Sequence, residues 1–272
     1  MKKMIAMLLA LVMALSLAAC GEKANDGSTD NDTAKTELVL GTSADYAPFE
    51  FMYPDDSGEM VYGGIDVSVA KYIADEMGLT LQVENMGFDY LLTSLDKGDF
   101  DIVLAAMEAT PDRLENADFS DPYYTDVPPA ILVKADKADQ YKTLADLNGK
   151  SVGAQTATTK LDMVNEMEGV TPVALQSVLD LVNELVYDKV DAILVDGGVA
   201  NEYAASNPDL VIADASAELG EATPYCVAVA KGDPKGLLPA INAAIAKMNE
   251  ENKLESFISA ADALKDVWQE VT

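Results

Sequence analysis

Hydrophobic and polar residues alternate along this chain with two different periods, which predicts helices and strands in turn. In residues 65–77 apolar side chains recur every four positions, as on one face of a helix, and Gly78 ends the pattern. Residues 79–83 then alternate between apolar and polar side chains, as in a half-buried strand. Residues 90–97 predict a second helix, and residues 102–107 are a continuous apolar run of strand length. This order implies a largely parallel sheet covered by helices.

The same alternation recurs in the second half of the chain, which predicts two similar α/β units. Strands are expected at residues 130–133, 152–155, 173–175, 190–195, 210–213 and 225–230, and helices at 159–167, 178–186 and most of 237–264. We therefore expect an α/β fold of two lobes, each a mostly parallel sheet flanked by helices, with a cleft between them. Ligands of open parallel sheets bind beyond the carboxyl ends of the strands, so the residues that follow each strand are candidates for a site.

The first 36 residues predict an export signal and a tether. A basic start precedes a short apolar run, residues 5–19, which suits a secretory signal better than a membrane-spanning helix. The run ends in Leu-Ala-Ala-Cys-Gly, which resembles a bacterial lipobox and implies removal of residues 1–19 and lipidation of Cys20. An ordinary signal peptide or a membrane anchor is the alternative. Residues 20–36 are then the lipidated cysteine and a polar, flexible tether.

Composition excludes several classes of function. The 272 residues include 47 Asp and Glu against 18 Lys and Arg, a formal net charge of −29, so nucleic acid is excluded as a partner. The absence of histidine removes Ser-His-Asp and Cys-His catalysis and histidine-based metal sites. Two cysteines are too few for a disulfide scaffold or a four-cysteine zinc site, and Cys226 is expected to be a small buried residue.

The segment that follows residues 102–107 suits an anion. Thr110 is a good helix N-cap, and Pro111 fits the first helical position. Arg113 lies in that first turn, where a guanidinium and free helix N–H groups can face the cleft and hold a carboxylate. A surface arginine paired with a neighbouring acidic residue is the alternative.

Two segments of the second half complete the pattern for a zwitterion. Thr158 and Thr159 lie between a predicted strand and a predicted helix, where they either grip the same anion or cap the helix. Asp196 ends the strand 190–195 and can accept hydrogen bonds from an ammonium, although an aspartate in a turn is the alternative. An anion clamp that faces an ammonium acceptor describes a site for a zwitterion.

Seven motifs occur along the chain in the order found in one protein family. They are GTSADYAPFE (41–50), GIDV (64–67), Phe88 with Leu91 and Leu92, TPDR (110–113), FSDPYY (119–124), LNGK with VG (147–153), and VDA with Asp196 (190–196). Together they resemble the extracellular solute-binding proteins of polar amino acid ABC importers, solute-binding family 3, over residues 37–270. No single motif is decisive, but seven in order are specific.

The resemblance implies a periplasmic-binding-protein-like fold that closes on one amino acid without a metal or cofactor. The family arginine that holds the ligand α-carboxylate falls on Arg113, and the acid that holds the α-ammonium falls on Asp196. Aromatic walls for the ligand side chain fall on Tyr46 and Phe88. The full set of expected ligand-binding residues is Ser43, Tyr46, Phe88, Ala106, Glu108, Thr110, Arg113, Thr158, Thr159 and Asp196.

Three positions depart from the family pattern. Several members that bind basic or amide side chains carry Asp where this chain has Ser43, and the family's Gly-Thr pair reads Ala157-Thr158 here. Glu108 stands where Ser or Thr is common, and a carboxylate in a cleft without water needs a partner. We expect Glu108 to contact the ligand, either at its ammonium beside Asp196 or at a second cationic group; turning outward to solvent is the alternative.

The resemblance also assigns lobes and a function. Residues 37–127 and 226–272 are expected to form lobe 1 and residues 128–225 lobe 2, with hinge strands near 127–133 and 225–230. The expected function is that of a binding protein, not an enzyme, which captures a polar L-amino acid, with a basic one left open, for an ABC permease and its cytoplasmic ATPase. A secreted dehydratase-like enzyme with Glu108 as general acid and a sensory receptor are the alternatives. A lipid-anchored monomer on the outer face of a Gram-positive-type membrane is expected.

Overall fold

The computed structural model describes residues 36–265 and residue 267, and the structural statements below concern these residues. The predicted export signal, the lipidation site Cys20 and all of the tether except residue 36 lie outside them. No helix in the described part of the chain is long and apolar enough to cross a membrane. Cys226 is buried and unpaired, as the sequence predicted, and burial raises the pKa of its thiol to about 11.

The first lobe is built on a five-stranded sheet. Its strands, in spatial order, are β5 (Thr80–Asn85), β1 (Glu37–Thr42), β6 (Ile102–Val103), β13 (Tyr225–Ala230) and β7 (Ala117–Tyr124). The first three run parallel, whereas β13 is antiparallel to both of its neighbours. Strand β13 runs the other way because the chain enters it from the second lobe, at the edge where β7 ends.

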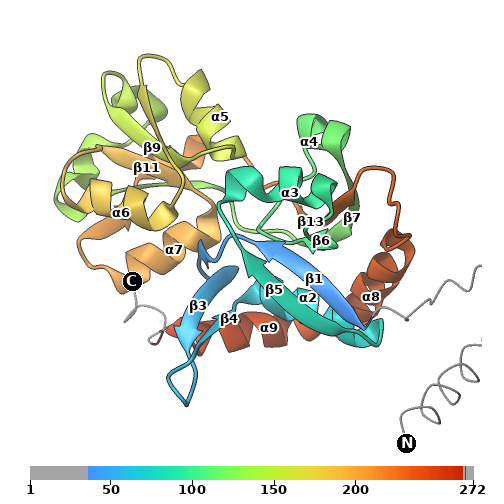
Figure 1. The fold of residues 1–272 in the computed structure, drawn as a ribbon. Helices are drawn as coiled ribbons and strands as arrows, with labels where there is room; N and C mark the ends of the chain where they lie inside the picture. The colour runs from blue at the N-terminus through green and yellow to red at the C-terminus, as the bar shows by residue number, and fades with distance from the viewer. Residues whose placement is uncertain (1–35, 266, 268–272) are drawn as a thin grey trace, which may run out of the picture. The chain divides into compact units, whose positions relative to one another are not determined.

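Helices cover both faces of this sheet (Figure 1). Because side chains of a strand alternate between faces, Val39 packs against α3 while Leu38 and Leu40 pack on the side of α2. The helices of this lobe are α2 (Ile65–Glu76), α3 (Leu91–Lys97), α4 (Pro111–Asn116), α8 (Leu238–Glu250) and α9 (Lys253–Asp262), with the short 3-10 helix η1 (Phe88–Tyr90).

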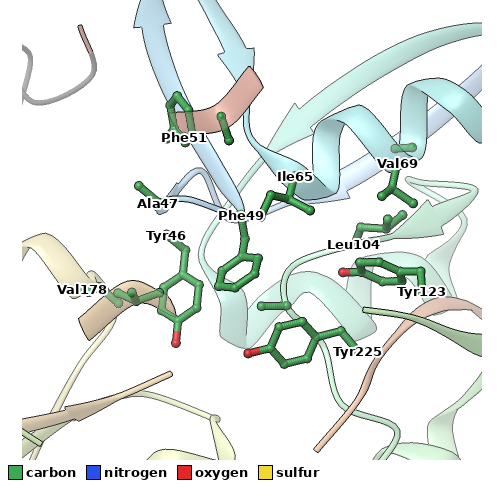
Figure 2. Packing of buried hydrophobic residues seen from close by; sticks show 14 of the residues in the cluster. Tyr46, Ala47, Phe49, Phe51, Ile65, Val69, Leu104, Tyr123, Val178 and Tyr225 are labelled. Carbon is green, nitrogen blue, oxygen red and sulfur yellow. The ribbon is translucent and has the colours of Figure 1, made fainter. Parts of the chain in front are cut away.

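A small antiparallel sheet, which the sequence analysis did not predict, follows β1. Its strands are β2 (Asp45–Tyr46), β3 (Glu50–Pro54) and β4 (Met60–Gly63). It holds Phe49 at the centre of an aromatic cluster, 6.2 Å from the ring of Tyr46 and 5.3 Å from the ring of Tyr225, to which it lies edge-on. Figure 2 shows these rings together, with Val178 of the second lobe beside Tyr46, so the buried cluster continues from one lobe into the other.

The second lobe repeats the arrangement of the first. Its strands, in spatial order, are β10 (Thr171–Leu175), β9 (Ser151–Gln155), β11 (Ala192–Val195), β8 (Ala130–Lys134) and β12 (Leu210–Ile212). Its helices are α5 (Thr159–Glu166), α6 (Val178–Val186) and α7 (Gly197–Ser206), with the 3-10 helices η2 (Ala135–Gln140), η3 (Leu144–Leu147) and η4 (Asp214–Glu218). The first three strands are again parallel, and β8 is antiparallel to both of its neighbours, β11 and β12.

The observed sheets agree with the expected fold and are mixed: in each, four strands run in one direction and one strand, β13 or β8, runs against them. The chain crosses between the lobes in residues 125–129 and 219–224, neither of which belongs to a strand. The strands at 130–134 and 225–230, where the hinges were expected, pair within the sheets. Both crossings lie at the sheet edges where α/β folds bind ligands.

Two other segments differ from expectation. The apolar run 102–107 is a strand only as far as Val103; at Ala106 the backbone turns, with φ at 46°, and the chain leaves the sheet. The long helix expected in residues 237–264 is two helices, because Asn252 adopts the left-handed conformation between α8 and α9.

Candidate ligand-binding site

One enclosed space lies between the lobes, and both lobes line it. Its lining residues are Ser43, Tyr46, Glu50, Phe88, Ala105, Ala106, Glu108, Arg113, Gln155, Thr158, Thr159, Lys160 and Asp196. The structure brings nine of the ten expected residues to this space. Thr110 is the exception: it caps α4, and its Oγ1 accepts the backbone N–H of Arg113 at 3.3 Å.

Arg113 extends from lobe 1 to lobe 2. Its Nη1 donates to the carbonyl of Glu108 at 3.0 Å, and its Nη2 donates to the carbonyl of Ala157 in lobe 2 at 3.2 Å. The guanidinium lies over the ring of Phe88, with 5.2 Å between its central carbon and the ring centroid. Burial lowers the pKa of Arg113, and the nearby carboxylates of Glu108 and Asp196 act in the opposite direction. A planar cation fixed in this way matches the geometry of a carboxylate.

Asp196 lies at the start of α7 in lobe 2 and pairs with an aromatic side chain of lobe 1. The hydroxyl of Tyr46 donates to Asp196 Oδ2 at 2.5 Å and lies 3.2 Å from the backbone nitrogen of Asp196, which donates to it. Burial and the charge of Asp196 raise the pKa of Tyr46 well above its usual value, so the phenol stays neutral and can donate.

Lys160 is a site residue that the sequence analysis missed. It is the second residue of α5, and its Nζ lies 3.0 Å from Glu108 Oε1 and 3.2 Å from Thr159 Oγ1 and also pairs with Asp196 Oδ1. The three charged side chains are only 7–10% exposed. Burial disfavours the ammonium, but the charges of Asp196 and Glu108 outweigh it and raise the pKa of Lys160. The alternative that Glu108 turns outward is therefore wrong.

Ala106 is held by a buried carboxyl pair behind the site. Its N–H donates to Asp66 Oδ2 at 2.7 Å, which fixes the left-handed turn that brings the following residues into the site. Glu50 and Asp66 are both buried and hydrogen-bond to each other. Burial first, and then the charge of Asp66, raise the pKa of Glu50 well above its usual range. The raised pKa favours the neutral form of Glu50, which can donate a hydrogen bond to the carboxylate of Asp66.

The lobe 2 wall is a helix N-terminus. Thr158 is the N-cap of α5: its Oγ1 accepts the N–H of Leu161 at 3.2 Å and donates to the carbonyl of Gln155 at 2.6 Å. Ala157, which stands where the family has glycine, adopts the left-handed conformation with φ at 63°. The turn expected of a glycine is thus kept without one, at the cost of backbone strain.

Ser43 lies beside the carboxyl group of Asp45. Its hydroxyl is 3.5 Å from Oδ1 of Asp45, and Oδ2 of Asp45 accepts the N–H of Val178 in lobe 2 at 3.1 Å. Burial raises the pKa of Asp45, while the hydrogen bonds from Ser177 and Val178 lower it. Asp45 therefore ties lobe 1 to the start of α6 and also places a carboxyl group next to Ser43.

The space left in the site is small, and its charges balance. The room among the lining side chains is about 10 Å³, close to the volume needed by one water molecule. Two cations, Arg113 and Lys160, stand against two anions, Glu108 and Asp196. No group of three or more Asp, Glu or Cys side chains in the described part of the chain is arranged to hold a metal ion.

Residues 38–259 match the family model of the bacterial extracellular solute-binding proteins, family 3. The arginine-binding extracellular protein ArtP of Bacillus subtilis is 36% identical over 94% of this chain and 96% of its own length. A probable histidine-binding protein of Campylobacter jejuni is 29% identical over the same shares of the two chains.

Solved structures give the same result. The amino acid ABC transporter substrate-binding protein AbpA of Streptococcus pneumoniae, bound to L-arginine, superposes with a TM-score of 0.79 at 32% identity. The match covers 85% of this chain and 96% of that protein. The similarity therefore extends over both lobes.

Proposed function

Since the chain belongs to the bacterial extracellular solute-binding proteins, family 3, we propose that it is the substrate-binding component of an ABC importer. It captures an L-amino acid between its two lobes and delivers it to a membrane permease. The observation that carries this proposal is the position of Arg113 from lobe 1 and Asp196 from lobe 2 at one enclosed space. A guanidinium and a carboxylate on opposite lobes are what an amino acid zwitterion needs to draw the lobes together.

Each lining residue then has a role toward the ligand. Arg113 holds the α-carboxylate, with Thr158 and Thr159 on the opposite side, and Asp196 holds the α-ammonium. Phe88 and Tyr46 form the walls for the ligand side chain. Ala106 and Glu108 offer backbone groups, and Ser43 closes the side-chain end. Closure removes water from around these charged groups, so their attraction to the charges of the ligand is stronger than in the open cleft.

A basic L-amino acid is the first ligand to test. The relatives ArtP and AbpA are named for arginine or bound to it. Ser43 lines the site where several family members that bind basic side chains carry aspartate, and the carboxyl group of Asp45, 3.5 Å from its hydroxyl, is not among the lining residues. The family is one of solute-binding proteins rather than of enzymes.

The enzyme and sensor alternatives have less support. A dehydratase-like reaction would use Glu108 as a general acid, but this carboxylate is engaged by the ammonium of Lys160 at 3.0 Å. A general acid has to carry a proton that it can donate. A sensory receptor and a transport protein both need only a closed, ligand-bound form. Direct binding of the protein to a permease would distinguish transport from sensing.

The location belongs to the same proposal. The family is extracellular, and the lipobox-like segment before Cys20 supports attachment of a lipid there. A tether between the lipid and residue 37 leaves the lobes free to open and to reach the permease as a monomer. A single-membrane envelope favours this arrangement, because without an anchor the protein would be lost.

The test is a thermal-shift screen of the Cys20→Ser protein, refolded after denaturation so that no ligand is carried over, against the twenty L-amino acids. A ligand at a hundredfold excess over its Kd stabilises the folded protein by about 2.7 kcal/mol, an easily measured shift. Calorimetry then gives the affinity of each hit. The absence of any shift from a folded protein across all twenty would contradict the proposal.

A further inference from the structure

The ammonium group of Lys160 has a hydrogen-bond acceptor in the protein for each of its three N–H donors. An ammonium has three N–H donors, and Lys160 Nζ has three partners: Glu108 Oε1 at 3.0 Å, Thr159 Oγ1 at 3.2 Å, and Asp196 Oδ1. The group is buried with both of its carboxylate partners. Its donors are therefore satisfied by the protein itself, and none is left for a ligand.

The position is the one assigned above to the ligand's α-ammonium. Asp196 is the proposed acceptor for that group, and its two oxygens are engaged by Lys160 and by the hydroxyl of Tyr46. A lysine ammonium and an amino acid α-ammonium are the same chemical group, with equal charge and the same three donors. Arg113, the proposed partner of the α-carboxylate, is hydrogen-bonded to the carbonyl of the same Glu108.

Lys160 also joins the lobes as a ligand would. It belongs to α5 of lobe 2, whereas Glu108 follows β6 in lobe 1, so their ion pair crosses the cleft. About 10 Å³ of room remains beside it, enough for one water molecule. An amino acid has about ten heavy atoms, so it enters only if the lobes part or the Lys160 side chain leaves.

We propose that Lys160 is a tethered competitor of the ligand, whose ammonium holds Asp196 and Glu108 until the α-ammonium of an amino acid displaces it. This inference rests on the proposed function, which supplies the ligand and the roles of Arg113 and Asp196. The apparent Kd is then the intrinsic Kd divided by the fraction of molecules in which Lys160 has left the site. The weakening is the same for every amino acid, because the competition concerns a group that all amino acids share.

Substitution of Lys160 tests this directly. Lys160→Gln removes the ammonium but keeps a side chain that can hydrogen-bond, and Lys189→Gln removes an exposed lysine paired with Glu184 as a control for net charge. The affinities of L-arginine, L-glutamine and L-glutamate are measured by calorimetry on the refolded Cys20→Ser protein. We expect Lys160→Gln to bind each probe that the parent binds at least about tenfold more tightly, and Lys189→Gln to match the parent.

A second measurement reports on the lobes without any amino acid. Spin labels on Met60→Cys in lobe 1 and Tyr187→Cys in lobe 2 occupy exposed positions, and their separation reports closure. We expect a short separation in the parent, a longer one in Lys160→Gln, and a return to the short one when the amino acid is added. Lys160→Met replaces Lys160→Gln if the latter does not fold.

The outcomes separate this inference from the proposed function. If neither the parent nor the variant gives a thermal shift with any of the twenty L-amino acids, the proposed function fails. If both bind with equal affinity, or the variant binds more weakly, only the competitor role is overturned. Selective loss of L-glutamate in the variant also overturns it, because Lys160 would then be a direct partner of an acidic ligand side chain.

Discussion

The hydroxyl of Tyr46 and the carboxylate of Asp196, 150 residues apart, form a 2.5 Å hydrogen bond between the two lobes. The backbone nitrogen of Asp196 donates back to the same hydroxyl at 3.2 Å. One phenol thus fixes both the orientation of the carboxylate and the start of α7. The carboxylate of lobe 2 that we propose as the ammonium acceptor is consequently positioned by a residue of lobe 1, which makes its geometry depend on closure.

Tyr46→Phe is expected to weaken amino acid binding with little effect on the fold. The ring stays, but the hydrogen bond to a buried carboxylate is lost, and such bonds contribute about 1.5–3 kcal/mol. Kd for the amino acid found in the screen should rise about tenfold or more, as measured by calorimetry. Tyr187→Phe, at a position that is 72% exposed, is the matched control and should leave Kd unchanged. An unaltered Kd in Tyr46→Phe would show that Asp196 does not depend on this bond.

Arg113→Lys is expected to reduce affinity although the positive charge is kept. A lysine cannot offer a planar pair of donors to a carboxylate or lie flat over Phe88. It also cannot reach two carbonyls with a rigid fork, as Arg113 does toward Glu108 and Ala157. Kd should rise at least about tenfold, while Lys71→Arg, an exposed change of the same two residue types, should have no effect. Equal affinities for Arg113→Lys and the parent would mean that charge alone recruits the ligand.

Asp66 is expected to make stability fall as the pH rises. Burial raises the pKa of Asp66 to about 6, so the folded protein holds this proton more tightly than the unfolded chain does. The free energy of unfolding therefore decreases between about pH 4 and pH 6, by about 3 kcal/mol for this group, and is constant above that range as far as Asp66 is concerned. Glu50, whose pKa is raised further, extends the fall to higher pH.

Urea unfolding at pH 4, 5, 6 and 7 measures this effect, with Asp66→Asn for comparison. The variant has no proton to lose at this position, so the stability of the parent relative to the variant should fall across the range. Carboxylates with a lowered pKa, such as that of Asp188 beside two lysines, act in the opposite direction, but they are common to both proteins and cancel in the difference. Glu50 contributes to the difference, because the charge of Asp66 raises its pKa. A difference that does not change with pH would remove Asp66 as the titrating group.

Ala157→Gly is expected to stabilise the protein. The left-handed conformation costs a non-glycine residue about 1–2 kcal/mol, and the greater freedom of glycine in the unfolded chain offsets part of this. The free energy of unfolding should increase by about 0.5–1 kcal/mol, measured in urea. Ala204→Gly, within α7, is the control and should lower stability by about 1 kcal/mol. A loss of stability in Ala157→Gly would mean that the turn is held by contacts of the alanine methyl group.

The sequence predicted most helices and strands because their apolar residues follow a single period. The stripe from residue 65 gave α2 almost to the residue, and the run at 225–230 is β13. The sheet of β2, β3 and β4 was missed, because its short strands mix aromatic, acidic and proline residues with no clear alternation. The run 102–107 was predicted as one strand because hydrophobicity does not reveal a left-handed residue such as Ala106.

The site was predictable where a residue's role depends on its local position. Arg113 comes after β6 of lobe 1 and Asp196 after β11 of lobe 2, so each lies toward the carboxyl edge of its own sheet, where ligands of α/β folds bind. Both residues line the space between the lobes. Lys160 could not be found in this way, since a lysine early in a helix usually faces solvent and its partner Glu108 lies 52 residues away. The unusual glutamate was the available signal: a buried carboxylate requires a counter-charge, which for Glu108 is Lys160 of the same chain rather than a ligand.

The guanidinium of Arg113 bridges the lobes by holding the main-chain carbonyl of Ala157, not a side chain. Because the acceptor is a main-chain group, substitutions at lining residues of lobe 2 such as Gln155 and Thr159 can change the size and shape of the lobe 2 wall without removing this acceptor. Selection for a new nutrient is then free to act on the lobe 2 wall while this inter-lobe contact is inherited unchanged. For a protein engineer, the same independence makes this wall the place to randomise first when a biosensor for a different metabolite is wanted.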